Sequence, residues 1–236
     1  MTQGALITGG TGAIGSAVTA RFLADGYDVA VTYRAAAEWE RLRSEQAAAV
    51  AAGKLLGIEA DVTDHDSMAS AVRAAAGRPG GLRVLAHVAG GYQGGTPVER
   101  LTEESVRGMI ELNLLSAFWA AKHAIPHLKR SGAGRLLFVS SRGAVQAQPG
   151  AAPYAAAKLA LHALVATLAQ ELRKDGVTAN AVLPSLVDTP QNRAVMPDAD
   201  VATWVRPEQI AALLSFLASD AAAAVTGALV PIYGKA

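Results

Sequence analysis

The sequence predicts an α/β fold in which a doubly wound, mostly parallel sheet of about seven strands carries helices on both faces. Short β-branched apolar runs alternate with longer alanine-rich stretches of helical period, as they do when helices connect parallel strands. Of the 236 residues 51% are hydrophobic and only 17% are charged, which allows a large buried core. Because no linker or composition shift divides the chain, we expect a single domain over residues 1–236.

Seven apolar runs predict the strands, over residues 5–8, 29–33, 55–59, 84–87, 135–140, 178–183 and 229–233. Pro231 in the last run cannot donate a ladder hydrogen bond, so this strand is expected at an edge of the sheet. Helical periodicity predicts helices over residues 13–25, 36–52, 64–77, 101–131 with a break, 153–175 and 207–219. The connection 185–204 lacks a strong helical pattern, and we expect it to form a lid over a small site.

Charge and residue content exclude several classes of partner. Lys and Arg number 21 against 20 Asp and Glu, so there is no excess of basic charge for a nucleic acid or an anionic membrane. The absence of cysteine excludes disulfides and cysteine-ligated metals, and it fits a reducing cytoplasm. The start Met1-Thr2-Gln3-Gly4 has no basic or long apolar leader, and the apolar runs are shorter than the roughly 20 residues of a membrane span. We therefore expect a cytoplasmic protein.

A glycine-rich turn follows the first predicted strand. Gly10, Gly12 and Gly15 form a G-x-G-x-x-G pattern, whose glycines let the backbone approach a pyrophosphate at a helix N-terminus. Because a strand precedes the turn and a helix follows it, we interpret it as a Rossmann-type dinucleotide site rather than as a merely steric glycine cluster. The residues expected to contact the cofactor here are Gly9, Thr11, Gly12, Ala13, Ile14 and Gly15.

The end of the second strand favours NADP(H) over NAD(H). NAD-binding folds carry an acid there that grips the ribose hydroxyls, whereas this sequence has Tyr33 and Arg34. A guanidinium can bind a ribose 2′-phosphate through charge-assisted hydrogen bonds, while an acid would repel it. The alternative is that Arg34 is an ordinary solvated arginine at a strand end.

Tyr154 and Lys158 form the candidate proton-transfer pair. Pro153 opens their helix, and a spacing of four residues places both side chains on one helical face. An ammonium close to the phenol would favour the phenolate and lower the phenol pKa toward a value useful for proton transfer. Two further polar residues lie next to predicted element ends. Ser141 follows the fifth strand, and Asn113 falls at the break in 101–131.

These motifs resemble the short-chain dehydrogenase/reductases along nearly the whole chain. The resemblance rests on the glycine turn, on the 13-residue step from Ser141 to Tyr154, and on Asn113, Lys158, Asp61-Val62, Ala89-Gly90 and the stretch Pro184 to Thr189. It implies reduction of a carbonyl or C=N group of a small-molecule substrate by hydride transfer from a nicotinamide cofactor. It also implies a homodimer or homotetramer packed through 101–131, 153–175 and the C-terminal strand.

The resemblance assigns a role to each matching residue. Tyr154 would be the general acid, Lys158 would bind the nicotinamide ribose, Ser141 would hydrogen-bond the substrate oxygen and Asn113 would hold a water between Lys158 and solvent. Cofactor contacts are also expected from Asp61, Val62, Ala89, Gly90, Pro184, Val187 and Thr189. The sequence departs from the family pattern at Ala13, at His87-Val88 and at Ser185, where the family has glycine, two asparagines and glycine respectively.

Rival interpretations concern substrate, catalysis and metal. The segments 88–95 and 183–204 resemble quinonoid dihydropteridine reductase, which suggests a dihydropteridine-like reductase. Tyr92 and Trp204 would then offer aromatic faces to a planar ring, or alternatively both rings pack against the apolar residues of the lid itself. A non-catalytic NADP(H)-sensing regulator is the alternative from another class, although it has no need for Ser141, Tyr154 and Lys158. His123 and His127 are four residues apart but lack a third ligand and are interrupted by Pro126, so no metal site is expected.

Overall fold

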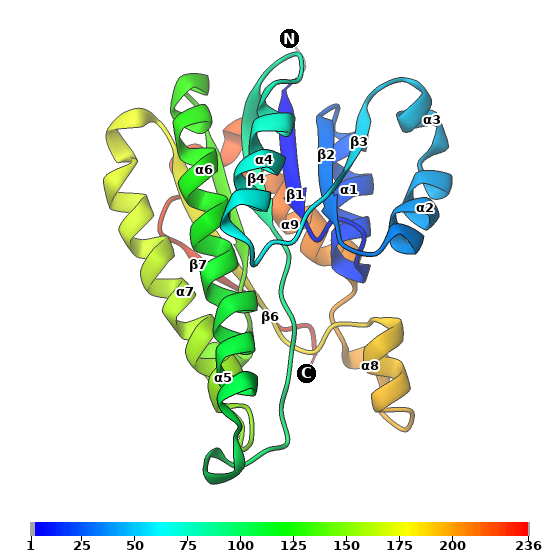
Figure 1. Ribbon diagram of the computed structural model, residues 1–236, viewed down its shortest axis with the longest axis vertical. Helices are drawn as coiled ribbons and strands as arrows, with labels where there is room; N and C mark the ends of the chain where they lie inside the picture. The colour runs from blue at the N-terminus through cyan, green and yellow to red at the C-terminus, as the bar shows by residue number, and fades with distance from the viewer. Residues whose placement is uncertain (1–2, 236) are drawn as a thin grey trace.

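The computed structural model describes residues 3–235 and joins seven strands in one parallel sheet (Figure 1). The strands are β1 (Gly4–Thr8), β2 (Asp28–Tyr33), β3 (Leu55–Glu59), β4 (Leu82–His87), β5 (Arg135–Val139), β6 (Thr178–Pro184) and β7 (Leu229–Ile232). Their order in the sheet is β3-β2-β1-β4-β5-β6-β7, and every neighbouring pair is parallel. The predicted fold is confirmed. Met1 and Thr2, on which the expected lack of a leader partly rested, lie outside the described residues.

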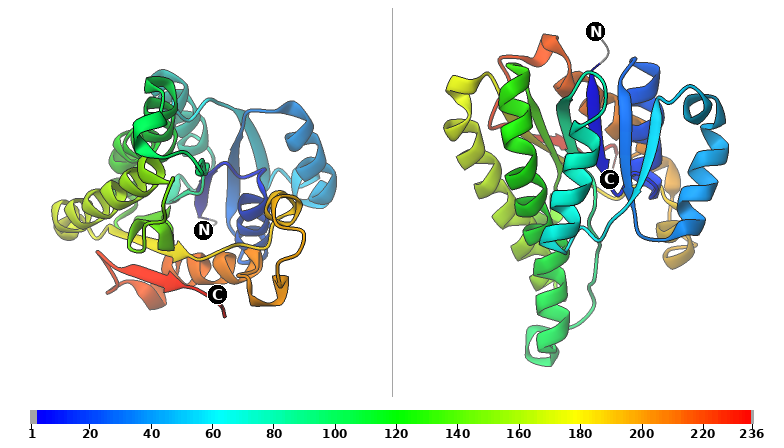
Figure 2. Two further views of the ribbon diagram at one scale, coloured as in Figure 1. Left: turned by 90° about the horizontal axis from the view of Figure 1, so that it is seen from below. Right: turned by 45° about the horizontal axis from the view of Figure 1, so that its top comes forward.

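Helices cover both faces of the sheet (Figures 1 and 2). One face carries α4 (His65–Ala76), α5 (Glu103–Ile110), α6 (Ser116–Ser131) and α7 (Ala152–Glu171), and the other carries α1 (Ala13–Ala24), α2 (Ala36–Glu45), α3 (Ala47–Ala51) and α9 (Pro207–Ala218). Successive residues of a strand face opposite layers, so Leu6 packs in the core beneath α4, α6 and α7, while Ala5 and Ile7 pack beneath α1 and α9. Burial on both faces explains why the strands read as continuous apolar runs.

Three expectations about helices need correction. The helix expected over 36–52 breaks at Gln46, whose φ of −114° and ψ of 30° are not helical. The break expected in 101–131 is a π-helical turn, Glu111–Leu115, that keeps α5 and α6 in one continuous rod. The connection 185–204 contains the short helix α8 (Pro190–Val195), which Thr189 caps by accepting a hydrogen bond from the Asn192 N–H at 3.2 Å.

The edge position predicted for the last strand is confirmed, because β7 pairs with β6 alone. Ala181 N donates to Ala228 O and Ser185 N donates to Ile232 O. In a parallel ladder, alternate residues of a strand direct their backbone N–H and C=O groups toward the neighbouring strand. Ala228 and Ile232 do so here, so the backbone groups of Leu229 and Pro231 point away from β6. The missing N–H of Pro231 therefore costs β7 none of its bonds to β6.

Helix α7 is long and apolar enough, by length and composition alone, to cross a bilayer. In the structure it packs against the sheet, and its buried side includes the ionisable residues Lys158 and His162. These features are those of a core helix, and the apolar length of α7 follows from its burial.

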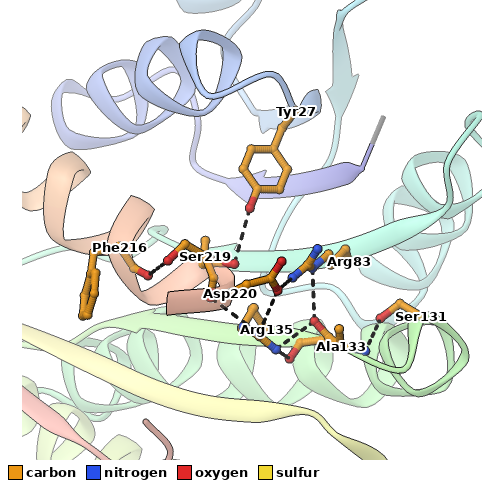
Figure 3. Close-up of polar contacts among 10 residues, drawn as sticks. Tyr27, Arg83, Ser131, Ala133, Arg135, Phe216, Ser219 and Asp220 are labelled. Carbon is orange, nitrogen blue, oxygen red and sulfur yellow. Dashed lines mark hydrogen bonds and ion pairs between the residues drawn. The ribbon is translucent and has the colours of Figure 1, made fainter. Parts of the chain in front are cut away.

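The amino ends of β4 and β5 hold two buried arginines against an exposed carboxylate (Figure 3). Arg83 and Arg135 are 8% and 2% exposed, and both lie beside Asp220, which is the carboxylate in contact with them. Arg135 also donates to Ala133 O at 2.8 Å and to Gly134 O at 3.0 Å. This cluster ties adjacent strands to the segment that follows α9.

Candidate active site

The predicted site residues gather at the carboxyl ends of β1 and β4, where the strand order reverses. β1 and β4 are neighbours in the sheet although β2 and β3 separate them in sequence. A Cβ at Gly9 would lie 3.0 Å from the Cα of Ala89, so the loops after the two strands touch. Viewed onto this edge, α8 lies to one side of the strand ends, and α5 and α7 lie to the other (Figure 2, left). Open α/β sheets bind their ligands at such a crevice.

The glycine turn has the geometry of a phosphate cradle. Gly9 has a φ of +65°, which other residues rarely adopt, and a Cβ at Gly15 would lie 2.7 Å from the Cα of Gly10. Gly12 caps α1 without a side-chain hydrogen bond, which leaves the first N–H groups of that helix free for a ligand. The turn therefore fits the pyrophosphate of a dinucleotide.

The ribose corner combines predicted and unexpected residues. Arg34 lies close enough to Asp61 to lower the pKa of that carboxyl group, although the hydrogen bonds from Thr63 are the larger cause. Tyr33 stacks on Trp39 with ring centroids 5.6 Å apart and planes 8° apart. Trp39 on α2 thus packs against Tyr33 and is half-buried.

Two residues of α2 at this corner were missed by the sequence analysis. Glu38 accepts a hydrogen bond from the Thr11 hydroxyl at 2.9 Å, and Arg41 donates to Thr11 O at 2.5 Å. Their spacing of three residues, which puts them on one face of α2, was the available signal. A carboxylate and a second guanidinium therefore stand beside the phosphate turn in addition to Arg34.

Tyr154, Ser141 and Tyr92 form the reactive corner. The Tyr154 hydroxyl is hydrogen-bonded to Ser141, whose Oγ also accepts from the Gly143 N–H at 3.0 Å. The ring of Tyr92 meets that of Tyr154 edge-on, with centroids 5.0 Å apart and planes 80° apart. Tyr92 is 64% exposed, so it presents an aromatic face at the mouth of the site.

The pKa of Tyr154 is shifted upward, whereas the sequence analysis predicted a downward shift. Burial raises the pKa of its phenol and outweighs the lowering by the Ser141 hydrogen bond. Lys158 is not among the groups that shift this pKa, and its ammonium donates to Val139 O at 2.9 Å. The phenol therefore keeps its proton through the neutral pH range, which suits a proton donor.

Lys158 is buried directly beneath this corner. It is 5% exposed, and burial lowers its pKa to about 8. A Cβ at Gly90 would lie 3.1 Å from Lys158 Nζ and 2.9 Å from Asn113 Oδ1, so both side chains flank Gly90. The four residues predicted to carry the chemistry are thus assembled around the loop after β4.

Asn113 occupies the π turn and ties it to that loop. Its Nδ2 donates to Gly91 O at 3.0 Å and to Met109 O at 3.2 Å, and its Oδ1 accepts from the Gly91 N–H at 3.1 Å. π turns leave a backbone carbonyl without its usual helical partner, and the Asn113 amide satisfies that of Met109. The side chain is thereby held toward Gly90 and Lys158.

Comparison with known proteins agrees with this geometry. The family profile described as short chain dehydrogenase matches residues 3–200. The chain belongs to the short-chain dehydrogenase/reductase family. It is therefore an oxidoreductase of the NAD(P)-dependent type, as predicted from the Ser141, Tyr154 and Lys158 pattern.

Individual members of the family are similar over their whole length. The 3-oxoacyl-[acyl-carrier-protein] reductase MabA of Mycobacterium tuberculosis is 34% identical over 99% of this chain and 92% of its own. The cis-4-hydroxycyclohexanecarboxylate dehydrogenase of Sinomonas cyclohexanicum is 32% identical over 98% of this chain and 94% of its own. A short-chain dehydrogenase/reductase structure from Mycobacterium ulcerans superposes with a TM-score of 0.92 at 28% identity, over 100% of this chain and 90% of that one.

The segment after β6 contains three of the residues that the resemblance assigns to the cofactor. Pro184 ends β6, and Val187 is buried and forms a bridge to Val205. Thr189 uses its hydroxyl to cap α8. Trp204 is only 6% exposed, which favours the alternative that its ring packs within this segment.

The histidines considered as metal ligands do not converge. His123 packs edge-on against His65 with centroids 4.6 Å apart, whereas His127 Nδ1 is 2.6 Å from Arg130 Nη2. Pro126 is accommodated within α6 and does not interrupt it. Residues 3–235 contain no cluster of three or more potential metal ligands.

Proposed function

We propose that this chain is an NADP(H)-preferring carbonyl reductase in which Tyr154 donates the proton to the substrate oxygen. The observation that carries the proposal is the arrangement of the Tyr154 phenol, which is hydrogen-bonded to Ser141, protonated in the neutral range and placed at the mouth of the site. A non-catalytic sensor would have no use for a proton donor there.

In this mechanism each residue has a defined task. The nicotinamide, when bound, supplies the hydride. Tyr154 gives its proton to the substrate oxygen as negative charge develops, and Ser141 stabilises that oxygen by hydrogen bonding. Lys158 would bind the nicotinamide ribose. Its pKa is about 8, so at neutral pH its amine is mostly protonated and can support reprotonation of Tyr154. Asn113 holds a water that leads from Lys158 to solvent.

The preference for NADP(H) rests on Arg34, with Arg41 as a second cation near the phosphate turn. Asp61, Val62, Ala89, Gly90, Pro184, Val187 and Thr189 complete the cofactor contacts. Glu38 opposes the preference, because its carboxylate would repel a 2′-phosphate. We propose that the two guanidiniums prevail, since each can form paired hydrogen bonds to phosphate.

For the substrate we propose a compact ring-bearing carbonyl compound, with a quinonoid dihydropterin as the second candidate. Tyr92 supports this class, because its exposed ring beside Tyr154 can stack on a planar substrate. Among the relatives, printed names cover both an acyl-carrier-protein thioester and a cyclohexane carboxylate. We expect higher kcat/KM on ring-bearing carbonyls than on long-chain 3-oxoacyl thioesters, and steady-state kinetics showing the reverse order would contradict this substrate class.

We propose a cytoplasmic homodimer or homotetramer that packs through α5, α6, α7 and the β7 region. Phe118 on α6 and Leu159 on α7 are 42% and 53% exposed and would be covered by such packing. Phe216 on α9 and Leu229 on β7 are half-exposed near the other proposed contact.

The decisive experiment is Tyr154→Phe, which removes only the phenolic hydroxyl. We expect at least a hundredfold loss of carbonyl reduction, as for loss of a general acid, with NADPH affinity and thermal stability close to the parent. Parent activity should fall as the pH rises through the raised pKa of Tyr154, since reduction needs the protonated phenol. Turnover in Tyr154→Phe within threefold of the parent would show that the proton comes from elsewhere.

A further inference from the structure

His87 ends β4 at the centre of the sheet and is buried. It is 2% exposed, and each ring nitrogen faces a hydroxyl. Nδ1 lies 2.9 Å from the Oγ1 of Thr8, and Nε2 lies 3.1 Å from the Oγ of Ser116. Thr8 ends β1 just before the phosphate turn, and Ser116 opens α6 just after the π turn that carries Asn113.

The donors and acceptors available to Ser116, His87 and Thr8 determine where each proton lies. Ser116 Oγ donates its single proton to Leu112 O at 2.6 Å, so toward His87 it can only accept. His87 therefore carries its proton on Nε2, and its Nδ1 accepts from the Thr8 hydroxyl. The Thr8 oxygen in turn accepts from the Ala89 N–H at 3.4 Å.

A protonated ring would break this arrangement. Imidazolium has no free lone pair, so the Thr8 hydroxyl would lose its acceptor. Among the described residues no carboxylate acts on His87, and Lys158 is the charged group that does. Burial, together with Lys158, lowers the pKa of His87 to about 3, in keeping with a ring that stays neutral.

We propose that His87 is a positioning residue that holds the phosphate turn and the Asn113 π turn in fixed register. One ring nitrogen anchors the start of the cofactor turn through Thr8, and the other anchors the π turn through Ser116 and Leu112 O. The assignment rests on the proposed role of Asn113, because the π turn matters to the reaction only through that side chain and its neighbour Lys158. His87 itself contacts no reacting atom.

Breaking one anchor at a time separates this role from simple core filling. Thr8→Val removes the bond on the cofactor side, and we expect NADPH to bind about three- to tenfold more weakly with kcat little changed, as for one lost hydrogen bond. Ser116→Ala removes the bond on the π-turn side, and we expect kcat to fall by a similar factor, about three- to tenfold, with NADPH affinity within twofold of the parent. NADPH affinity is measured by fluorescence titration without substrate.

Two further variants control for the loss of a hydroxyl group away from His87. Thr178→Val changes a buried strand threonine at the opposite end of the sheet, and Ser131→Ala removes a serine bond to the Leu128 carbonyl at the far end of α6. Both should leave NADPH affinity and kcat unchanged. If Thr8→Val and Ser116→Ala alter affinity and kcat in parallel, or alter neither, His87 is a packing residue and the proposal is overturned.

Nitrogen-15 NMR of the parent protein tests the proposal without relying on activity or on a variant that folds. The expected spectrum between pH 5 and 8 shows a protonated Nε2 and an unprotonated Nδ1 in His87. An imidazolium, or a proton on Nδ1, would overturn it. If Tyr154→Phe keeps its activity while these nitrogen signals and the Thr8→Val affinity loss are found, the proton-donor mechanism fails and the positioning role of His87 on the cofactor side remains.

Discussion

At the scale of single residues, the ribose corner places opposite charges within reach of one ligand. Arg34 and Arg41 offer positive charge, and Glu38 bonded to Thr11 offers negative charge. We therefore expect the proposed preference for NADPH over NADH to be a balance of attraction and repulsion that a single substitution shifts in either direction.

We predict opposite effects from removing the two signs of charge. Arg34→Gln should weaken NADPH binding about tenfold and leave NADH binding nearly unchanged, because a charge-assisted contact to the 2′-phosphate is lost. Glu38→Gln should tighten NADPH binding severalfold by removing repulsion. Fluorescence titration with both cofactors measures the ratio.

Arg43→Gln is the matched control, because Arg43 lies on the same helix and pairs with Glu40 at 3.2 Å. Its cofactor preference should equal that of the parent. Equal NADPH and NADH affinities in the parent would contradict the assignment of this corner to a 2′-phosphate.

Residue types and spacing were enough to single out Tyr154, Lys158, Ser141 and Asn113, whose proposed roles depend on local order along the chain. The same reasoning missed Glu38 and the contacts of His87, which arise only when α2 folds back on the turn and β4 lies beside β1. It also gave the wrong direction for the Tyr154 pKa, since burial cannot be judged from a spacing of four residues.

At the scale of elements, the junction of β1 and α1 depends on how closely the helix approaches its own turn. A Cβ at Gly15 would overlap the carbonyl group of Gly9 and lie 2.7 Å from Gly10 Cα, whereas a Cβ at Gly12 would meet only Gly9 O at 3.6 Å. Two glycines of one motif therefore have different steric tolerances. The motif in the sequence does not distinguish them.

We predict that Gly15→Ala displaces α1 and Gly12→Ala does not. Gly15→Ala should lower stability by about 1–3 kcal/mol through overpacking and weaken NADPH binding more than tenfold. Gly12→Ala should keep the stability of the parent, so any loss of affinity there reports on the ligand alone. Thermal melts with and without NADPH measure both effects, and equal stability loss in the two variants would refute the steric distinction.

Elements that depend on tertiary contacts were the ones predicted least well. The π turn needs the Asn113 amide to satisfy a backbone carbonyl, and α8 needs the Thr189 cap, so neither shows in periodicity alone. The strands were located to within two residues of their bounds because β-branched runs and burial on both faces are properties of the strand itself.

At the scale of the whole molecule, the carboxyl ends and the amino ends of the strands have different roles. The carboxyl ends hold the candidate site, and the amino ends hold Arg83 and Arg135, whose one ion-pair partner within residues 3–235 is Asp220 (Figure 3). Arg135 is nearly fully buried, and its Nε has no hydrogen-bond partner. Removing Asp220 would leave two like charges close together in a low dielectric.

We predict that Asp220→Asn lowers the free energy of unfolding by about 1–3 kcal/mol, a value reduced from that of a fully buried pair because Asp220 is itself 81% exposed. Glu103→Gln breaks the exposed Arg107 pair and should cost at most about 0.5 kcal/mol. Urea denaturation measures both. Equal small losses would mean that the buried guanidiniums are adequately satisfied by backbone carbonyls.

The proline at the sheet edge also bears on how copies of the chain can meet. An exposed parallel edge offers alternating donors and acceptors on which a strand from another molecule can form, and such growth leads to fibrous aggregates. In β7 the outward row lacks the donor of Pro231, and only Leu229 and its flanking residues remain to template pairing. The same residue that marks the end of the sheet thus removes one of the donors through which a strand of another molecule would pair.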